Sequence, residues 1–436
     1  MTFLTDTLTM EKITDFIRRF QQYELPRLLN YARYYRGDQD IMKKRVKDET
    51  KPCNRIVTNF CHSIVTNYQG YLTGNDITYS SPEDISAIVD VLSYNDVRTE
   101  DNEFLRQALI FGKAYEICYI DEDNKQRFKV FDTRQCFAIY DNTINQNLLC
   151  VVRFYPIDDF DLTKGYNVDI YYDTKIEHYV ANTGLTSLRF VGDEAHYYNQ
   201  VPVVIFSLNE DEDSIFDKVI TLQDAYNTLL SAEVDDFQAF CDAYLVLKGV
   251  NAEAEDIQSM KENRVLLVGD NGEVNYVNKA INDTQIENML SNIEKQIHTI
   301  SNSPDFTDDA FGTASGVAMK YKLLGFENTA GAIAANMTKA LQKRIELICE
   351  ILGMVEGEVM WRDVEISFTR NLPVDYQELT TIITQLKGTV SDRTLLALLP
   401  FVSDIDKELE MVEETKQKNM ELYSFQSPLQ EEDDEV

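Results

Sequence analysis

The sequence is poor in several residue types, and each shortage argues against a class of protein. Its 436 residues include a single Trp and four isolated His, namely His62, His178, His196 and His298. The H-E-x-x-H and H-x-x-x-H spacings are absent, which disfavours a histidine-based metal site or acid–base pair. Both phosphate-cradling patterns, G-x-x-x-x-G-K-[ST] and G-x-G-x-x-G, are missing too, so we do not expect an autonomous nucleotide hydrolase.

Paired cysteines and long apolar runs are also lacking. The seven Cys are odd in number and never form a C-x-x-C pair, which predicts reduced and mostly buried thiols: Cys53, Cys61, Cys118, Cys136, Cys150, Cys241 and Cys349. No run approaches the ~20 apolar residues of a membrane span. Charged side chains interrupt the first 25 residues, so we expect no signal peptide. These features predict a soluble protein made in a cytoplasm, without a membrane partner or a cofactor.

Basic residues are outnumbered. Lys and Arg total 41 against 74 Asp and Glu, which gives a formal net charge of −33. Affinity for DNA comes mainly from Lys and Arg that neutralise phosphates, so tight wrapping of nucleic acid is disfavoured. A protein that lets DNA slide past without sticking remains compatible with this charge.

Apolar periodicity predicts a helix-rich α+β protein. Spacing of three and four residues predicts helices at about 10–23, 26–36, 55–72, 215–245, 283–300, 314–352, 376–386, 392–399 and 404–418. Short β-branched and aromatic runs, separated by Asp, Asn and Gly, predict an antiparallel, meander-like sheet between 114 and 206, with strands at 115–120, 128–131, 148–155, 168–172, 176–180 and 203–206. A further strand is expected at 364–368.

The helix at 215–245 would be about 45 Å long, which is long for a small globular core. Its polar face is acidic and is expected to be solvated. A compact insert follows, with a short helix at 253–260 and a hairpin in which 265–268 and 274–277 flank the turn residues Asp270, Asn271 and Gly272. The stretch 330–335 has little side-chain bulk, so another backbone is expected to approach it closely, and replacing Gly331 with Leu should destabilise the protein.

The polar segment 303–316 carries the main alternative chemistry. Asp305, Asp308 and Asp309 could ligate a divalent cation in a soluble metal-dependent enzyme, but the Gly and closing Glu of an EF-hand loop are absent. Gly312 to Gly316 lacks the spacing of a nucleophile elbow, so Thr313 or Ser315 is better explained as a helix cap. The basic residues of the following helix favour pairing between subunits over a nucleic-acid groove: Lys320, Lys322, Lys339, Lys343 and Arg344.

Three stretches resemble the portal proteins of long-tailed phages of Gram-positive bacteria. The first combines YYRGD at 34–38, NRIVTNF at 54–60 and GYLTGNDI at 70–77. The second is the order of long helix, small insert, helix and acidic loop from 215 to 316. The third is SGVAMKYKL at 315–323, and its family motif comprises Ser315, Gly316, Ala318, Lys320 and Lys322. Together they cover nearly the whole chain, although the part after 373 matches only in being helical.

The resemblance implies a ring-forming portal fold with named regions. Residues 1–214 and 317–372 would form the wing, 215–244 and 283–302 the two stem helices, and 245–282 the clip. Residues 303–316 would be the tunnel loop, 373–418 the crown helices, and 419–436 an acidic and disordered tail. A non-portal virion adaptor, lacking the stem and the through-hole, is the remaining alternative.

The resemblance also implies roles for particular residues. The tunnel loop would face DNA with Asp305, Phe306, Thr307, Asp308, Asp309 and Phe311. The acidic stem face would line the channel with Asp224, Glu233, Asp235, Asp236 and Asp242. The clip hairpin of Asp270, Asn271, Gly272 and Glu273 would dock partners. Neither a catalytic residue nor a metal site is implied.

The implied function is structural. Twelve copies would form a ring at one capsid vertex of the virion, through which double-stranded DNA is packaged and ejected without sequence specificity. Implied partners are the terminase large subunit, the head–tail connector or adaptor, and the major capsid and scaffolding proteins, with assembly in the host cytoplasm. Twelve chains would surround the hole with a formal charge of about −400, which repels phosphates and leaves no deep binding minimum.

Overall fold

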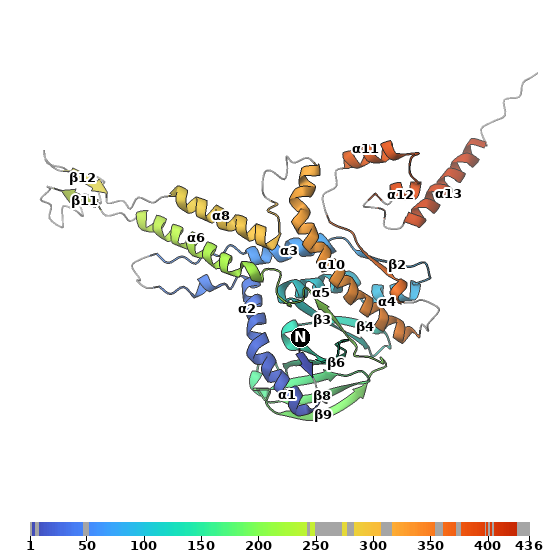
Figure 1. Cartoon of the computed structure of the whole chain (residues 1–436), viewed down its shortest axis with the longest axis horizontal. Coiled ribbons are helices and arrows are strands. Elements are labelled where there is room, and N and C mark those ends of the chain that lie inside the picture. Colours follow the sequence, from blue (N-terminus) through green and yellow to red (C-terminus); the bar gives the residue numbers. More distant parts are fainter. Residues whose placement is uncertain are drawn as a thin grey trace, which may run out of the picture.

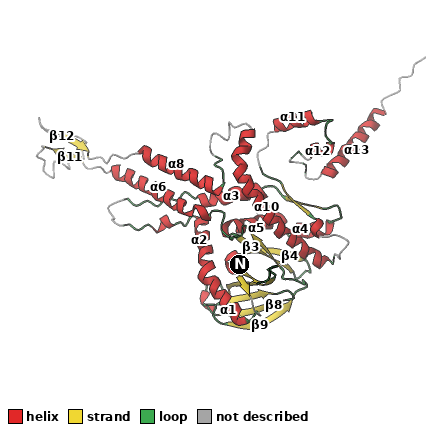
Figure 2. Ribbon diagram, in the orientation of Figure 1, coloured by secondary structure: helices red, strands yellow, loops and turns green. Residues whose placement is uncertain are grey.

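The computed structural model describes residues 2–4, 8–46, 52–241, 245–248, 273–276, 283–306, 316–353, 361–371, 376–396, 398–399, 402 and 405–424. Three parts are visible: a body that holds the larger sheets, an arm of two helices that projects from it, and a group of C-terminal helices (Figure 1). Helices and strands are both plentiful (Figure 2). The α+β, helix-rich class predicted from the sequence is confirmed.

The chain enters the body through two nearly continuous helices. α1 (Met10–Arg19) and α2 (Leu25–Arg36) are joined by one π-helical turn, and Pro26 lies in the first turn of α2, where a missing N–H costs no hydrogen bond. α2 ends at Gly37, whose φ of 86° is a left-handed conformation that glycine adopts without strain. The two predicted helices are confirmed.

The third helix begins later than predicted. α3 (Phe60–Thr73) is capped by Asn59, whose side chain accepts a hydrogen bond from the backbone N–H of His62. Residues 52–59, which the apolar spacing partly placed in this helix, contain no helix or strand. Three of their backbone N–H groups instead donate to side chains between residues 227 and 235.

Two sheets build most of the body. The larger has the order β1-β5-β6-β7-β8-β9 and is antiparallel except between β1 and β5, and the smaller has the order β10-β3-β4. The strands are β1 (Thr2–Leu4), β3 (Lys113–Ile120), β4 (Gln126–Phe131), β5 (Cys136–Asp141), β6 (Leu148–Pro156), β7 (Tyr166–Tyr171), β8 (Lys175–Ala181), β9 (Leu188–Ala195) and β10 (Val203–Ser207). The predicted meander is confirmed for β6, β7 and β8, which share a sheet with the unpredicted β5 and β9. The single predicted sheet is wrong for the strands at 115–120, 128–131 and 203–206, because they form the separate smaller sheet.

β3 lies between two apolar layers, and six of its eight residues are buried. Tyr115 and Ile117 pack in a cluster with residues of the larger sheet, including Val151. Ala114 and Cys118 belong to the main core, which also holds the inner faces of the helices. Because both faces of this strand are covered, apolar residues lie on both of them, and the sequence does not alternate between apolar and polar residues.

Three helices cover the smaller sheet and its surroundings: α4 (Ser86–Tyr94), α5 (Val97–Phe111) and α10 (Gly316–Leu352). α10 has 37 residues, about 55 Å, and crosses the body in contact with β10, α3 and α4 (Figure 1). Its buried side chains recur at helical spacing: Phe326, Ala330, Ile333, Met337 and Leu341. The predicted helix is confirmed, whereas α4 and α5 were not predicted.

The close approach expected at Gly331 is absent within the described part of the chain. A Cβ built on Gly331 meets no atom within 4 Å, and Ala332 and Ala335 are exposed. The prediction is wrong for Gly331 in the single subunit, because Gly331 lies beside the buried stripe of α10, whereas Ala330 and Ala334 of the same stretch are buried on it.

The arm consists of α6 (Ile220–Cys241) and α8 (Asp283–Ser301), which lie side by side, with β11 (Leu245–Lys248) and β12 (Glu273–Tyr276) at its tip (Figure 1). A 3-10 turn at Asp217–Val219 precedes α6, so the predicted helix at 215–245 is shorter. β12 pairs with β11, which was not predicted. The expected partner strand at 265–268 and the helix at 253–260 lie outside the described residues.

The chain closes with a small sheet of β13 (Glu365–Phe368) paired with β2 (Ile77–Ser80), and with α11 (Tyr376–Leu386), α12 (Asp392–Leu396) and α13 (Ile405–Ser424). α12 is shorter than predicted, and α13 extends into the segment expected to be a tail. Residues 425–436 lie outside the described part. Among the described helices, none combines the length and apolarity that crossing a bilayer requires.

Candidate functional site

The root of the arm is held by a ladder of hydrogen bonds along α6. Four polar side chains, one per four residues, accept from every second backbone N–H of the segment 54–60. The rungs are Asn54 N to Asp235 Oδ1 (2.6 Å), Ile56 N to Ser231 Oγ (2.9 Å), Thr58 N to Asn227 Oδ1 (3.0 Å) and Phe60 N to Gln223 Oε1 (3.0 Å). We call these eight residues the polar ladder.

The geometry of the two chains explains the spacing. Two residues of extended backbone span about 6.6 Å, and four residues of α-helix rise 6.0 Å, so about half an ångström of mismatch accumulates per rung. The backbone of 54–60 thereby obtains partners without a sheet. The stretch 54–60 is one of those that resemble the portal protein family. Its bonds to α6 give a physical reason for that sequence, because they anchor the arm to the body.

The inner rungs are fully buried and connect to a further amide. Gln39, Gln223 and Asn227 are each 0% exposed. Asn227 donates to Gln39 Oε1, and Gln39 donates in turn to Asn59 Oδ1 at 3.0 Å. Buried amides of this kind have few alternative partners, so they fix the register of α6 against the body.

The acidic face of α6 is not uniformly solvated, contrary to the sequence prediction. Asp224 accepts a hydrogen bond from the Tyr34 hydroxyl at 2.8 Å, and Asp217, just before the helix, accepts one from Tyr31 at 2.7 Å. Burial raises the pKa of Asp224, although its bond to Tyr34 works in the opposite direction. These carboxylates contact the N-terminal helices of the same chain.

Asp235 is the outermost rung and the most strongly bound acid of α6. Besides Asn54 N–H it binds the Nδ2 of Asn54 at 2.7 Å and the ammonium of Lys44 at 2.7 Å. Burial opposes its ionisation, but these donors outweigh burial and lower the pKa of the Asp235 carboxyl. Its charge is therefore shared with the body, and its role in lining a channel stays a prediction.

The remaining acids of the predicted stem face differ in position. Glu233 and Asp236 are half-buried, and Asp242 lies outside the described residues. Burial, followed by the charges of Glu294 on α8 and Glu233 on α6, raises the pKa of Tyr226. The two helices therefore present negative charge to each other near Tyr226.

Of the predicted tunnel-loop residues, the structure describes two. Asp305 is half-buried beside Glu294 and His298 of α8, and Phe306 is 48% exposed with its ring edge-on to Phe326 at 6.2 Å. The others lie outside the described residues: Thr307, Asp308, Asp309 and Phe311. His298 is isolated from the other His in the sequence, yet the spacing of Glu294 and His298, one helical turn apart, could have identified the pair.

The predicted docking hairpin and the family motif are described in part. Asp270, Asn271, Gly272 and Ser315 lie outside the described residues, as does Thr313. Glu273 begins β12, and Gly316 begins α10. Ala318, Lys320 and Lys322 are exposed on the first turns of α10, so their side chains are accessible to another molecule.

A buried charge cluster, which was not predicted from the sequence, joins α10 to the body. The Arg344 guanidinium binds Glu116 of β3 through Nε (2.7 Å) and Nη2 (2.8 Å), and Asp101 of α5 through Nη1 (2.5 Å). All three side chains are at most 4% exposed. Burial raises the pKa of Asp101 and of Glu116 against the opposing effect of Arg344. The expected intersubunit role of Arg344 is therefore wrong, because its charge is satisfied inside the chain.

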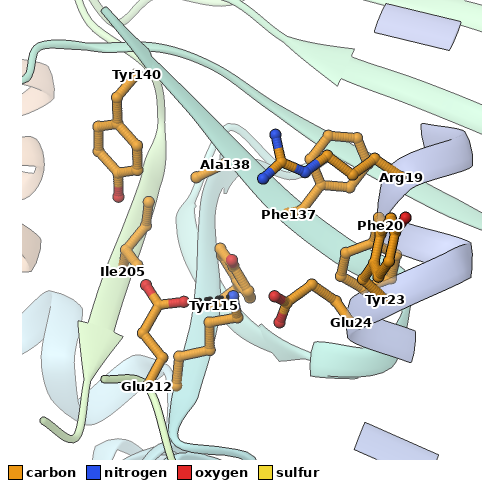
Figure 3. Close-up of a pocket in the computed structure, with 11 residues that line it drawn as sticks. Arg19, Phe20, Tyr23, Glu24, Tyr115, Phe137, Ala138, Tyr140, Ile205 and Glu212 are labelled. Atoms are coloured by element: carbon orange, nitrogen blue, oxygen red, sulfur yellow. Dashed lines mark hydrogen bonds and ion pairs between the residues drawn. The ribbon is translucent and has the colours of Figure 1, made fainter. Parts of the chain in front are cut away.

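A pocket of about 550 Å³ opens elsewhere in the body, between the π-helical turn, β5 and β3 (Figure 3). Phe20, Tyr23 and Tyr115 line it. Its wall carries Lys113 and Glu212, whose charged groups lie 2.8 Å apart. Burial opposes ionisation of Glu212, but Lys113 lowers its pKa overall. Because its two most buried charges are paired with each other, the pocket has the features of a structural cavity.

Comparison with solved structures defines the class of fold. The chain is similar to a chain in the neck of an empty GTA particle, with a TM-score of 0.51 and 11% identity, over 78% of this chain and 89% of that one. The match shows that the two chains share a class of fold.

Sequence relatives identify the family. The family of phage portal proteins described as SPP1 Gp6-like matches residues 15–422. The portal protein of Bacillus phage SPP1 is 23% identical, over 96% of this chain and 88% of that protein. The portal protein of Clostridium phage phiCD119 is 25% identical, over 89% and 92%. The chain belongs to this portal protein family, a family of structural virion proteins. The match lends no support to the metal-dependent enzyme or to a non-portal adaptor.

Proposed function

We propose that twelve copies of this chain form a ring at one vertex of the capsid, through which double-stranded DNA is packaged and later leaves. The family match over residues 15–422 supports the function. The neck of the empty GTA particle has C6 symmetry, which supports a ring of identical subunits. The observation that carries the proposal is the arm, because a helical pair that projects from a compact body needs neighbours to cover its sides.

In this ring α6 and α8 are the stem, and β11 with β12 belongs to the clip. The body would be the wing, and α11 to α13 the crown. Exposed apolar side chains on the arm, Phe237 on α6 and Met289 on α8, suit contact with adjacent stems. The clip would meet the terminase large subunit during packaging and the head–tail connector afterwards, and capsid and scaffolding proteins would surround the wing.

The channel would repel DNA rather than grip it. Asp224, Glu233, Asp235, Asp236 and Asp242 contribute negative charge to the stem, and Asp305, Asp308 and Asp309 to the segment that follows α8. Phosphates would then meet a repulsive wall along the whole path. DNA could move in either direction without sequence preference.

Imaging of the purified chain tests the proposal. Negative-stain microscopy should show rings with a central hole, and native mass spectrometry should give about twelve times the 50.3 kDa chain. Particles without a hole, at concentrations where assembly is complete, would refute it.

Shortening of the segment 303–316 tests the role of the loop. The variant should still form rings, because the polar ladder and the arm are intact, but it should package or retain less DNA. Loss of rings would show that the segment is architectural instead.

A further inference from the structure

We propose that Glu294, His298 and Asp305 bind a divalent transition-metal ion of the Zn²⁺ or Mn²⁺ type. Glu294 and His298 lie one turn apart on α8, and Asp305 returns to them from the segment after that helix. One ligand atom from each lies within 4.8 Å of the other two. Ligand atoms around a tetrahedral Zn²⁺ lie about 3.4 Å apart, so binding requires them to approach by at most about 1.4 Å.

The hydrogen bond of His298 prepares its ring for an ion. Nδ1 lies 2.8 Å from the carbonyl oxygen of Ser303. A carbonyl only accepts, so Nδ1 carries a proton, and the nitrogen that can bind an ion is Nε2. Histidine ligands of metal ions commonly make this second bond to a backbone carbonyl, because it fixes both tautomer and orientation.

The carbonyl that receives this bond is itself held in place. Ser303 is 1% exposed, its hydroxyl accepts from Asn67 at 2.9 Å, and its N–H donates to Ser301 Oγ at 3.3 Å. Phe60 packs edge-on against the His298 ring, with the centroids 5.9 Å apart. The imidazole is therefore oriented before any ion arrives, which lowers the entropic cost of binding.

The ligand set selects the type of ion. One imidazole nitrogen and two carboxylate oxygens suit Zn²⁺, Mn²⁺ or Co²⁺, whereas Ca²⁺ and Mg²⁺ prefer oxygen alone. Three protein ligands leave at least one position for water or for another group.

The site would connect the end of α8 to the start of the segment 303–316. Under the proposed function, on which this consequence rests, the ion would set the angle at which that segment leaves the stem. Binding of the ion itself does not depend on ring formation. The two hypotheses can therefore fail separately.

Metal binding by the full chain tests the site. Equilibrium dialysis against Zn²⁺, followed by elemental analysis, should give one high-affinity ion per chain, and Co²⁺ should show the visible absorption of a protein-bound ion. His298→Gln, Glu294→Gln and Asp305→Asn should each weaken Zn²⁺ binding at least tenfold. Mg²⁺ should compete poorly.

A matched control lies on the larger sheet. His178 also lies beside two carboxylates, with Nδ1 2.7 Å from Asp169 Oδ1 and Nε2 3.6 Å from Glu194 Oε1. Its Nδ1 contacts a carboxylate, whereas Nδ1 of His298 contacts a backbone carbonyl. His178→Gln should leave Zn²⁺ binding unchanged, and circular dichroism should verify the fold of every variant. Equal binding by the three site variants and the parent, loss in His178→Gln alone, or no high-affinity ion in the parent would each overturn the proposal.

Discussion

α6 and α10 are both long helices attached to the body through polar groups, but they use opposite means. α6 is held by four separate rungs, most of them neutral, spread over about 18 Å of helix. The most buried polar attachment of α10, beyond its apolar stripe, is one cation with two carboxylates. Single hydrogen bonds, such as that from Asn336 to the carbonyl of Leu208, add to it. Loss of one neutral rung should therefore loosen only the backbone around it. Loss of the buried cation should instead lower the free energy of unfolding of the whole body.

The largest effect is expected for Arg344→Met. Removal of the guanidinium leaves Asp101 and Glu116 buried without their counter-charge, which should lower the free energy of unfolding by about 3–5 kcal/mol. The loss should shrink as the pH falls, because protonation neutralises the two carboxylates. Denaturant unfolding followed by fluorescence of Trp361, which lies in a 3-10 turn against α10, reports it.

Lys343→Met is the matched control for that experiment. Lys343 is the preceding residue on α10, is partly exposed, and pairs with Glu346 near the surface. Its replacement should cost at most about 1 kcal/mol. Equal losses in the two variants would mean that the buried cluster adds nothing to the attachment of α10.

A middle rung should have an intermediate effect. Asn227→Ala deprives the N–H of Thr58 of its acceptor and Oε1 of Gln39 of its donor, at a cost of about 1–3 kcal/mol. The damage should be local, so amide exchange in peptides covering 52–60 should accelerate more than the Trp361 transition shifts. Thr228→Ala, at the next and exposed position, is the control. Uniform destabilisation would show that α6 and the body unfold as one unit.

The helices of the arm and the C-terminal group were predictable because their apolar residues recur regularly. α8 and α11 match their predicted ranges closely. α5 was missed because Glu100 and Asp101 are buried on it, and buried charges interrupt the pattern on which prediction depends. β9 was missed because it is mostly exposed and its apolar residues do not alternate.

The site was less predictable than the fold. Gln223, Asn227 and Ser231 look like a solvated helix face, and only their contact with residues 54–60 shows that they are buried. The same holds for Glu116, whose partner Arg344 is 228 residues away. Polar groups that pair across such distances leave no periodic signal in either segment, so composition and spacing cannot reveal them.

The outermost rung should show a smaller and pH-dependent effect. Asp235→Asn keeps the acceptor for Asn54 but loses the charge that binds Lys44, and should cost about 1 kcal/mol at neutral pH. The folded pKa of Asp235 is depressed, so its contribution is complete above the ordinary pKa of Asp and is lost as the pH falls through the folded value. The parent and the variant should therefore converge in unfolding midpoint as the solution is acidified, and a gap that stays constant would argue against the ion pair.

The smallest effect is expected at Gly331, on the open side of α10. Substitutions there distinguish the intrinsic stability of the helix from packing against a neighbouring copy. A Cβ at Gly331 meets nothing in the chain, so Gly331→Ala should stabilise the helix by up to about 1 kcal/mol through reduced backbone freedom. Gly331→Leu should not crowd the isolated subunit either. If a neighbouring copy packs against this face, Gly331→Leu should instead impair ring formation while the unfolding of the dissociated chain is unchanged. A loss of subunit stability with either side chain would show that α10 is covered from within after all.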